Sequence, residues 1–142
     1  MGEAVTESQS KLKIQNYTEH SELLMHKITE SLLNLGLNSK LKGFVYTKEA
    51  IYLYANTRIV NSVCKEIYTQ IAHKYSVTTT SIGRAIRKSI EDSWYEAKLN
   101  VSHDLFKYSY IKLDYLPTNL EFIATMAELI KLSIKKELFY NL

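Results

Sequence analysis

Apolar residues recur at intervals of three and four positions through most of the chain after residue 17, which is the spacing of amphipathic α-helices. The first stripe consists of Leu24, Ile28, Leu32 and Leu35. Gly36 follows it directly, where a glycine favours the end of a helix. Few segments alternate with a period of two, the pattern of a half-buried strand; the best candidate is the short segment 108–113, and we find no internal repeat. The sequence therefore predicts an all-α fold of about six helices.

Breaks in this periodicity define the helices that follow. Residues 40–46 predict a turn that leads to a short helix over about 47–56. A longer helix then continues to residue 75. Its apolar stripe consists of Ile59, Val63, Ile67, Ile71 and Tyr75. The run 76–79 breaks this helix, and a further helix is expected over about 80–96.

The C-terminal part of the chain contains a clear signal for a helix start. Pro117 disfavours helical backbone in the residue before it, and Thr118 and Glu121 have the spacing of a capping box. The last helix is therefore expected to begin at this point. Before it, Ser102 is expected to cap a short helix that continues to Phe106.

The first 17 residues are polar and aperiodic, and they predict a flexible tail before one domain over residues 18–142. A chain of 142 residues has the size of one ordinary domain, and its 46% hydrophobic and 23% charged residues exclude a disordered or low-complexity protein. Cys64 is the single cysteine, which excludes an internal disulfide and fits the reducing cytosol. No stretch approaches the ~18 apolar residues of a membrane span. The predicted location is cytoplasmic, with no membrane partner.

The charge of the chain is informative only in its distribution. Eighteen Lys and Arg against 15 Asp and Glu give a formal net charge of +3, which is too small to indicate nucleic acid by itself. No acidic residue lies between Glu66 and Glu91, however. The basic residues in this interval are Lys74, Arg84, Arg87 and Lys88. Because attraction to phosphate supplies most of the affinity for DNA, this segment is the candidate DNA-binding surface.

The same segment has the layout of a helix-turn-helix unit, whose second helix can enter the major groove of DNA. The first helix needs a small residue where the second helix crosses it, and Ala72 has that position. The turn needs an inward-facing apolar residue, which Val77 supplies, while Ser76 takes a position often held by glycine. The second helix, over 79–95, is the candidate recognition helix.

At about 100° per residue, the recognition helix has two distinct sides. One side is apolar or small: Ile82, Ala85, Ile86, Ser89, Ile90 and Ser93. The opposite side is polar and mainly basic: Thr80, Arg84, Arg87, Lys88 and Glu91. Arginine can bridge O6 and N7 of guanine, and Arg84 points where such contacts are made. The pattern alone leaves a DNA-reading face and an ordinary solvated face both open. Gly83 either permits close approach to DNA or is simply a lost side chain.

Four blocks of residues carry a resemblance to a known family. They are Lys42-Gly43-Phe44-Val45-Tyr46 with Glu49-Ala50-Ile51, Ile71-Ala72-His73-Lys74, Arg84-Ala85-Ile86-Arg87 with Ile90-Glu91 and Trp94, and Pro117-Thr118-Asn119 with Glu121-Phe122-Ile123-Ala124. In this order and spacing, over about 28–132, the chain resembles the C-terminal effector domain of stage 0 sporulation protein A. That family contains the response regulator that starts endospore formation in bacteria.

The resemblance implies a six-helix domain that binds a short duplex element close to TGTCGAA, often in tandem copies with protomers arranged head to tail. Arg84 matches the guanine-reading arginine of the family, and Arg87 also matches the family residue at its position. Lys88 stands where the family has histidine, and a phosphate contact survives that change. Gly83 replaces a glutamate and Ser81 an arginine, so the base preference beside the Arg84 contact is left open.

The resulting DNA-contacting set is Thr80, Ser81, Gly83, Arg84, Arg87, Lys88 and Lys135. Lys135 lies in the segment 131–142, which extends the last helix, contacts phosphate or forms a partner surface. Segment 95–106 aligns with the family region that meets the sigma subunit of RNA polymerase, and it is the most divergent part. The phosphorylated receiver of the family has no counterpart before residue 28, so the chain is expected to be either a receiver-less relative, which we favour, or an effector fragment. DNA binding independent of phosphorylation is therefore expected.

The predicted function is a sequence-specific transcription regulator, and two other classes compete with it. An enzyme is disfavoured because Cys64 and His73 lie on roughly opposite sides of one helix, and no phosphate-binding glycine motif occurs. No metal site or cofactor is predicted, because the four histidines have no Cys or His partner at ligand spacing. The second alternative is an interaction module that pairs with, or antagonises, a full-length regulator. Eleven tyrosines would suit such an interface, but half-buried core positions are the favoured interpretation.

Overall fold

The computed structural model describes residues 7–57, 63–97 and 116–140. These ranges contain five helices: α1 (Glu7–Asn34), α2 (Lys42–Asn56), α3 (Val63–Tyr75), α4 (Thr79–Ala97) and α5 (Asn119–Tyr140). No strand occurs within them, and the predicted all-α fold is confirmed. The short helix expected over 102–106, the alternating segment 108–113 and the first part of the helix containing Ile59 lie outside the described residues.

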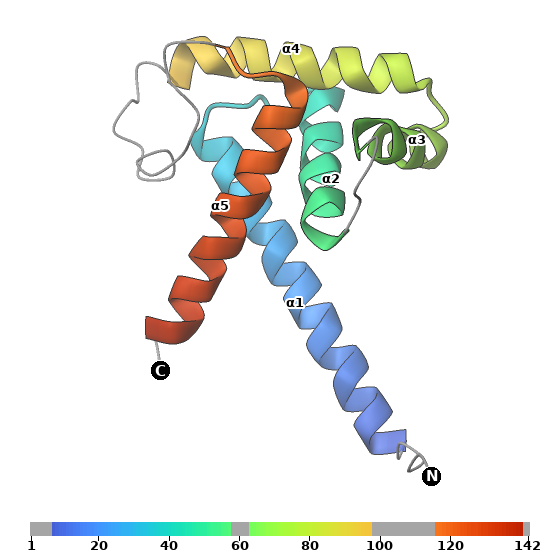
Figure 1. Cartoon of the computed structure of the whole chain (residues 1–142), viewed down its shortest axis with the longest axis vertical. Coiled ribbons are helices and arrows are strands. Elements are labelled where there is room, and N and C mark those ends of the chain that lie inside the picture. The colour runs from blue at the N-terminus through green and yellow to red at the C-terminus, as the bar shows by residue number, and fades with distance from the viewer. Residues whose placement is uncertain (1–6, 58–62, 98–115, 141–142) are drawn as a thin grey trace.

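Helix α1 begins well before the position expected from the sequence. The sequence predicts a flexible tail over residues 1–17, whereas residues 7–17 are helical. The segment contains no glycine or proline, and Glu7 and Lys11 form an ion pair of 3.4 Å at the helical spacing of four residues. Figure 1 shows the first part of α1 extending away from the other helices. A helix in that position needs no apolar stripe, which is why periodicity does not reveal it.

The C-terminus of α1 is capped as the sequence predicts. Gly36 adopts a left-handed conformation with φ of 89°. The N–H of Leu37 donates to the carbonyl of Leu32 at 3.1 Å, and the N–H of Gly36 donates to the carbonyl of Leu33 at 3.0 Å. This is the Schellman arrangement, and the burial of both Leu32 and Leu37 completes it.

Helix α2 starts at Lys42, five residues before the predicted start, and the predicted turn is correspondingly shorter. Asn38 makes the turn, since its side-chain oxygen accepts the N–H of Lys40 at 3.0 Å. The sequence predicts Gly43 as part of the turn, but it lies inside the helix at the point where α2 approaches α4. The glycine serves this close approach rather than the turn.

Helix α2 is the centre of the fold and packs against α1, α3, α4 and α5. In Figure 1, α4 lies across one end of the group formed by α1, α2 and α5, and α3 lies beside one half of α4. The fully buried side chains include Ile28 and Leu32 of α1, Ile51 of α2, Ile82, Ile86 and Ile90 of α4, and Phe122 and Met126 of α5. The predicted stripe of α1 is therefore confirmed as core.

The tyrosines around α2 belong to the core and its margin. Tyr46 is buried and its ring meets that of Tyr75 edge-on, with 5.3 Å between the centroids. Tyr52 and Tyr54 are half-buried and pack against the core. The interpretation of these three as core residues is confirmed.

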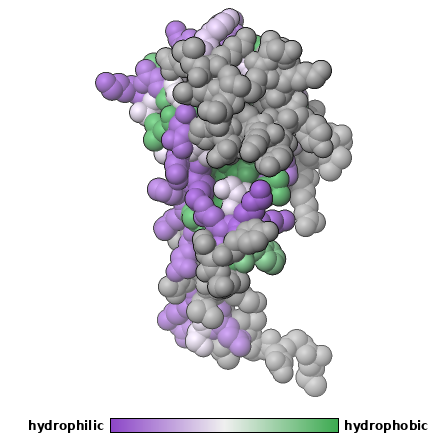
Figure 2. Space-filling model, turned by 90° about the vertical axis from the view of Figure 1, so that its left-hand side faces the viewer, coloured by the Kyte–Doolittle hydropathy of each residue, from purple (hydrophilic) through white to green (hydrophobic). Residues whose placement is uncertain are grey.

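On the face drawn in Figure 2, hydrophilic residues cover most of the coloured surface. None of the helices in the described ranges has the length and apolar character needed to cross a membrane.

Candidate nucleic-acid interface

Helices α3 and α4 form the predicted helix-turn-helix unit. The N–H of Val77 donates to the carbonyl of Ala72 at 3.0 Å, and the N–H of Ser76 donates to that of His73 at 3.4 Å. This repeats the Schellman pattern of α1, with Ser76 in the left-handed position at φ of 55°. Ala72 is buried and Val77 packs against the core, as predicted. The turn is therefore tight and its direction is fixed by the backbone.

Helix α4 is capped by Thr78. Its hydroxyl accepts the N–H of Ser81 at 3.1 Å, and its carbonyl accepts the N–H of Ile82 at 3.2 Å. The hydroxyls of Thr78 and Ser81 also lie 2.8 Å apart. The Ser81 side chain is thus engaged with the cap while it remains exposed.

The two sides of α4 are divided as the sequence predicts. Its apolar side is buried, and Ser89 and Ser93 are each only 4% exposed. On the opposite side, Thr80, Ser81, Arg84 and Lys88 are exposed. Four of the seven candidate DNA-contacting residues therefore share one solvent-facing surface, which we call the α4 surface.

Two of the four basic residues of this segment form ion pairs within the described part of the chain. Lys74 forms an ion pair of 2.6 Å with Glu49 of α2. Arg87 donates through Nε to Glu91 at 3.0 Å. Arg84 and Lys88 have no ion-pair partner among the residues that the structure describes. The positive charge of the α4 surface is therefore that of Arg84 and Lys88.

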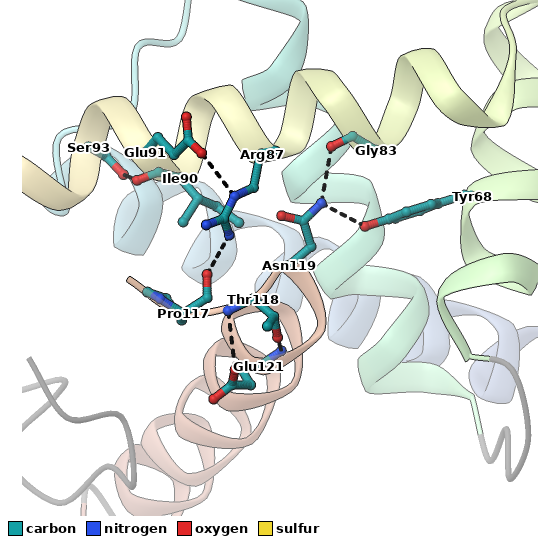
Figure 3. A network of polar contacts seen from close by, with 10 residues as sticks. All are labelled: Tyr68, Gly83, Arg87, Ile90, Glu91, Ser93, Pro117, Thr118, Asn119 and Glu121. Carbon is teal, nitrogen blue, oxygen red and sulfur yellow. Dashed lines mark hydrogen bonds and ion pairs between the residues drawn. The ribbon is translucent and has the colours of Figure 1, made fainter. Parts of the chain in front are cut away.

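Arg87 faces the start of α5 rather than open solvent. Its Nη1 donates to the carbonyl oxygen of Pro117 at 2.6 Å, in addition to the bond to Glu91. Figure 3 shows the guanidinium between these two acceptors. The side chain is half-buried. Arg87 thus has a role in packing α4 against α5, and its contact with DNA stays a prediction.

Gly83 lies beside Tyr68 of α3. A Cβ at Gly83 would meet Tyr68 Cε2 at 3.4 Å, which is ordinary contact, so the position does not require glycine for space. Asn119 of α5 donates from Nδ2 to the carbonyl of Gly83 and to the hydroxyl of Tyr68, each at 3.1 Å. The backbone of Gly83 is therefore bonded to α5, and the same Asn119 amide joins α5 to Tyr68 of α3.

Lys135 is not brought together with the α4 surface. It follows Asn119 by 16 residues on α5, which is about 24 Å along a helix axis. It is exposed, and the same end of α5 exposes Leu132, Leu138 and Phe139. The C-terminal segment extends the last helix as far as Tyr140. Of the three alternatives for this segment, helix extension is confirmed.

A shallow groove of about 410 Å³ adjoins the α4 surface and was not identified from the sequence. Its lining residues are Lys65, Tyr68 and Thr69 of α3 and Thr79, Thr80 and Gly83 of α4. Lys65 and Thr69 are exposed and lie one helical turn apart. That spacing could have indicated that Lys65 and Thr69 share one face of α3. Their position next to Thr80, however, depends on the angle between α3 and α4, which the sequence does not give.

Among the residues of the sequence, Cys64 and the histidines are the candidates for catalysis or metal binding. Burial raises the pKa of the Cys64 thiol, which keeps it protonated and poorly nucleophilic. Within the described ranges, no three His, Cys, Asp or Glu side chains are grouped so that they could hold a metal ion.

A comparison with protein families shows to which family the region around this helix-turn-helix unit belongs. The model for "Sporulation initiation factor Spo0A C terminal" matches residues 28–130, which extend from α1 to α5. The chain belongs to this family. The resemblance found in the sequence is thereby confirmed. The Spo0A C-terminal family binds DNA as the effector domain of a sporulation regulator, and it is not an enzyme family.

The match includes both helices of the helix-turn-helix unit and the start of α5. Lys135 and the exposed apolar residues at the end of α5 lie beyond residue 130 and are outside the matched region. The part of the chain that is common to the Spo0A C-terminal family is therefore the part that contains the α4 surface.

Proposed function

We propose that this chain is a transcription regulator that inserts the α4 surface into the major groove of duplex DNA and reads a short element close to TGTCGAA. In this proposal Arg84 bridges O6 and N7 of a guanine, and Thr80 and Ser81 lie against neighbouring bases or phosphates. Lys88 contacts the phosphate backbone. Gly83 leaves the base beside the Arg84 contact unread by a side chain.

The observation that carries this proposal is the exposure of Arg84 and Lys88, which form no ion pair within the described residues, on a helix whose opposite side packs into the core. Ile82, Ile86 and Ile90 have no exposed surface, so α4 cannot turn about its axis without opening the core. A helix held by its buried side, with an exposed arginine that has no ion-pair partner in the described part of the chain, has what a bidentate base contact needs. The acidic residues Glu91 and Asp92 follow only in the second half of α4.

The groove beside α4 supports a second row of contacts. Lys65 and the hydroxyls of Thr69 and Thr80 are the kinds of group that bind phosphate oxygens. The groove is continuous with the α4 surface through Thr80. We therefore include Lys65 as a phosphate contact that positions the DNA strand next to the recognition helix.

The direct test is fluorescence anisotropy with a labelled TGTCGAA duplex and a scrambled duplex at about 150 mM salt, where non-specific binding is weak. A preference of a hundredfold or more for the element supports the proposal. The Arg84→Ala variant should lose about 1–3 kcal/mol of specific binding and little binding to the scrambled duplex. Lys40→Ala, an exposed lysine before α2, is the matched control. Equal binding of wild type to both duplexes, and to any sequence selected from a random pool, contradicts the proposal.

Four further features belong to the proposed function. Protomers bind tandem elements head to tail, and the region 95–106 meets the sigma subunit of RNA polymerase. Tyr95, at the start of that region, is 71% exposed, and residues 98–115 lie outside the described part of the chain.

A protein that acts on the bacterial chromosome works in the cytoplasm. DNA binding by this chain is also proposed to be independent of phosphorylation, so acetyl phosphate should leave its affinity unchanged.

One observation favours a second candidate, an interaction module that pairs with or antagonises a full-length regulator. The end of α5 exposes Leu138 to 59% and Phe139 to 77%, and large exposed apolar side chains often mark a protein interface. Replacing both with Ser distinguishes the two candidates. If the surface serves pairing, the double variant loses association with a regulator and keeps its affinity for DNA.

A further inference from the structure

The start of α5 is joined to the recognition helix at two points that are one helical turn apart. Asn119 Nδ2 donates to the carbonyl of Gly83 at 3.1 Å, and the carbonyl of Pro117 accepts from Arg87 Nη1 at 2.6 Å. Figure 3 shows both contacts on the side of α4 that faces α5. Arg84, the proposed base-reading residue, lies in the sequence between the two anchored positions and is exposed.

Asn119 also connects the recognition helix to α3. The same Nδ2 donates to the hydroxyl of Tyr68 at 3.1 Å, and a Cβ at Gly83 would be within 3.4 Å of the Tyr68 ring. The carbonyl of Gly83 can only accept a hydrogen bond, so the amide group that faces it must be the NH2. One side chain therefore binds the backbone of α4 and the side chain of α3 simultaneously.

From this geometry we propose that Asn119 is a positioning residue that fixes α4 along its axis, and that it thereby sets how sharply the protein discriminates between DNA sequences. The proposal rests on the function proposed above. Isoleucine side chains hold the rotation of α4, and the hydrogen bond from Asn119 adds a directional contact with one particular carbonyl of the helix. A hydrogen bond to a helix carbonyl specifies one register.

Specific and non-specific binding differ in how much register matters. A bidentate contact from Arg84 to guanine needs donor–acceptor distances of about 2.7–3.2 Å for two bonds at once. Attraction of Lys88 to phosphate falls off gradually with distance and tolerates a small shift. Loss of the Asn119 contacts is therefore expected to reduce specific binding and leave binding to an unrelated duplex nearly unchanged.

The chain offers a matched control in the same turn. Thr118 and Glu121 form the capping box of α5, with N–H to side-chain oxygen distances of 3.2 and 3.1 Å, and neither bond reaches α4. Thr118→Ala should therefore lower stability without altering the register of α4. Asn119→Leu, of similar volume, removes both donor contacts, and Tyr68→Phe removes one of them.

The test measures dissociation constants of the full chain for its preferred duplex and for a scrambled duplex, with urea unfolding of each variant. We expect Asn119→Leu to lower the ratio of the two constants about tenfold and to change scrambled binding less than twofold. Tyr68→Phe should lower the ratio by a smaller factor, and Thr118→Ala should retain the ratio of wild type.

Two outcomes overturn the proposal in different ways. If wild type prefers one duplex and both Asn119→Leu and Tyr68→Phe retain that preference, Asn119 does not set specificity, while the proposed function stands. If Asn119→Leu does not fold, Tyr68→Phe decides alone. If wild type prefers no duplex at all, the proposed function fails and this inference fails with it.

Discussion

Gly43 of α2 lies directly against Ser89 of α4. A Cβ at Gly43 would lie 2.1 Å from the Ser89 hydroxyl oxygen and 2.4 Å from the carbonyl oxygen of Ala85. The second of these atoms belongs to the backbone of the recognition helix and cannot move without moving the helix. The small residues on the buried side of α4 and the glycine of α2 are therefore two halves of one helix crossing.

We predict that Gly43→Ala destabilises the protein by about 1–3 kcal/mol, because the added methyl group overpacks this crossing. Gly83→Ala is the matched control. At that position the Cβ meets only the Tyr68 ring, at the ordinary contact distance of 3.4 Å, and alanine gains up to ~1 kcal/mol of helix propensity. Urea unfolding followed by circular dichroism measures both. Equal effects of the two substitutions would contradict the assignment of Gly43 to a crossing.

A second prediction concerns the turn of the helix-turn-helix unit. Ser76 has a left-handed backbone at φ of 55°, where a residue with a Cβ is disfavoured relative to glycine. Ser76→Gly should therefore stabilise the protein by about 0.5–1 kcal/mol. Gly36 has the corresponding position after α1, at φ of 89°, so Gly36→Ser should destabilise by a similar amount. Thermal unfolding of the two variants should shift in opposite directions, and a shift of both in one direction would exclude this explanation.

The sequence predicts those features that depend on neighbours in the chain. The two sides of α4 follow from its periodicity, and the capping box at Thr118 and the C-cap at Gly36 follow from local spacing. A glycine between a lysine and aromatic residues favours a turn locally, so the sequence predicts Gly43 in the turn. The contact that requires glycine at this position is with Ser89, 46 positions further along the chain. Local patterns carry no information about such a partner.

The same limit applies to the candidate interface. The sequence predicts Arg84 and Lys88 on the exposed side of α4, and both are exposed there. The side of a helix on which a residue lies follows from its position in the helical period alone. Arg87 shares a helix with them, but its partner is the carbonyl of Pro117, 30 residues away. The groove beside Thr80 likewise depends on where Lys65 of α3 comes to lie. The sequence thus predicts the helices, but it does not predict the contacts between them.

A third prediction concerns stability at alkaline pH. Glu49 accepts hydrogen bonds from Lys74 at 2.6 Å and from the Tyr75 hydroxyl at 2.8 Å. The bond to Glu49 raises the pKa of Lys74 above its ordinary value of 10.5. Burial, together with the bond to Glu49, raises the pKa of Tyr75 above 10.0. Folding therefore favours the protonated form of both groups.

The sign of the pH dependence follows from these directions. A group whose pKa is higher in the folded protein contributes stability below its ordinary pKa and loses it as the pH rises through the folded value. The free energy of unfolding should thus fall above about pH 10, and Glu49→Gln should make the fall shallower. Tyr68, whose pKa is raised chiefly by burial, has no contact with Glu49 and should retain its share in the variant. Parallel curves for wild type and variant, measured by urea unfolding at several pH values, would refute the role of Glu49.

The last prediction concerns the extent of the DNA-contacting surface. Each phosphate contact that is lost should reduce the slope of log affinity against log salt by about 0.9. Lys88→Ala and Lys65→Ala should each reduce the slope by about this amount, because one lies on the α4 surface and the other lines the adjoining groove. Lys135→Ala should leave the slope unchanged, since Lys135 lies about 24 Å along α5 from the contact with α4. Anisotropy titrations between about 50 and 200 mM salt measure all three slopes. A reduced slope for Lys135→Ala would mean that DNA also passes the far end of α5, and an unchanged slope for Lys65→Ala would confine the interface to α4.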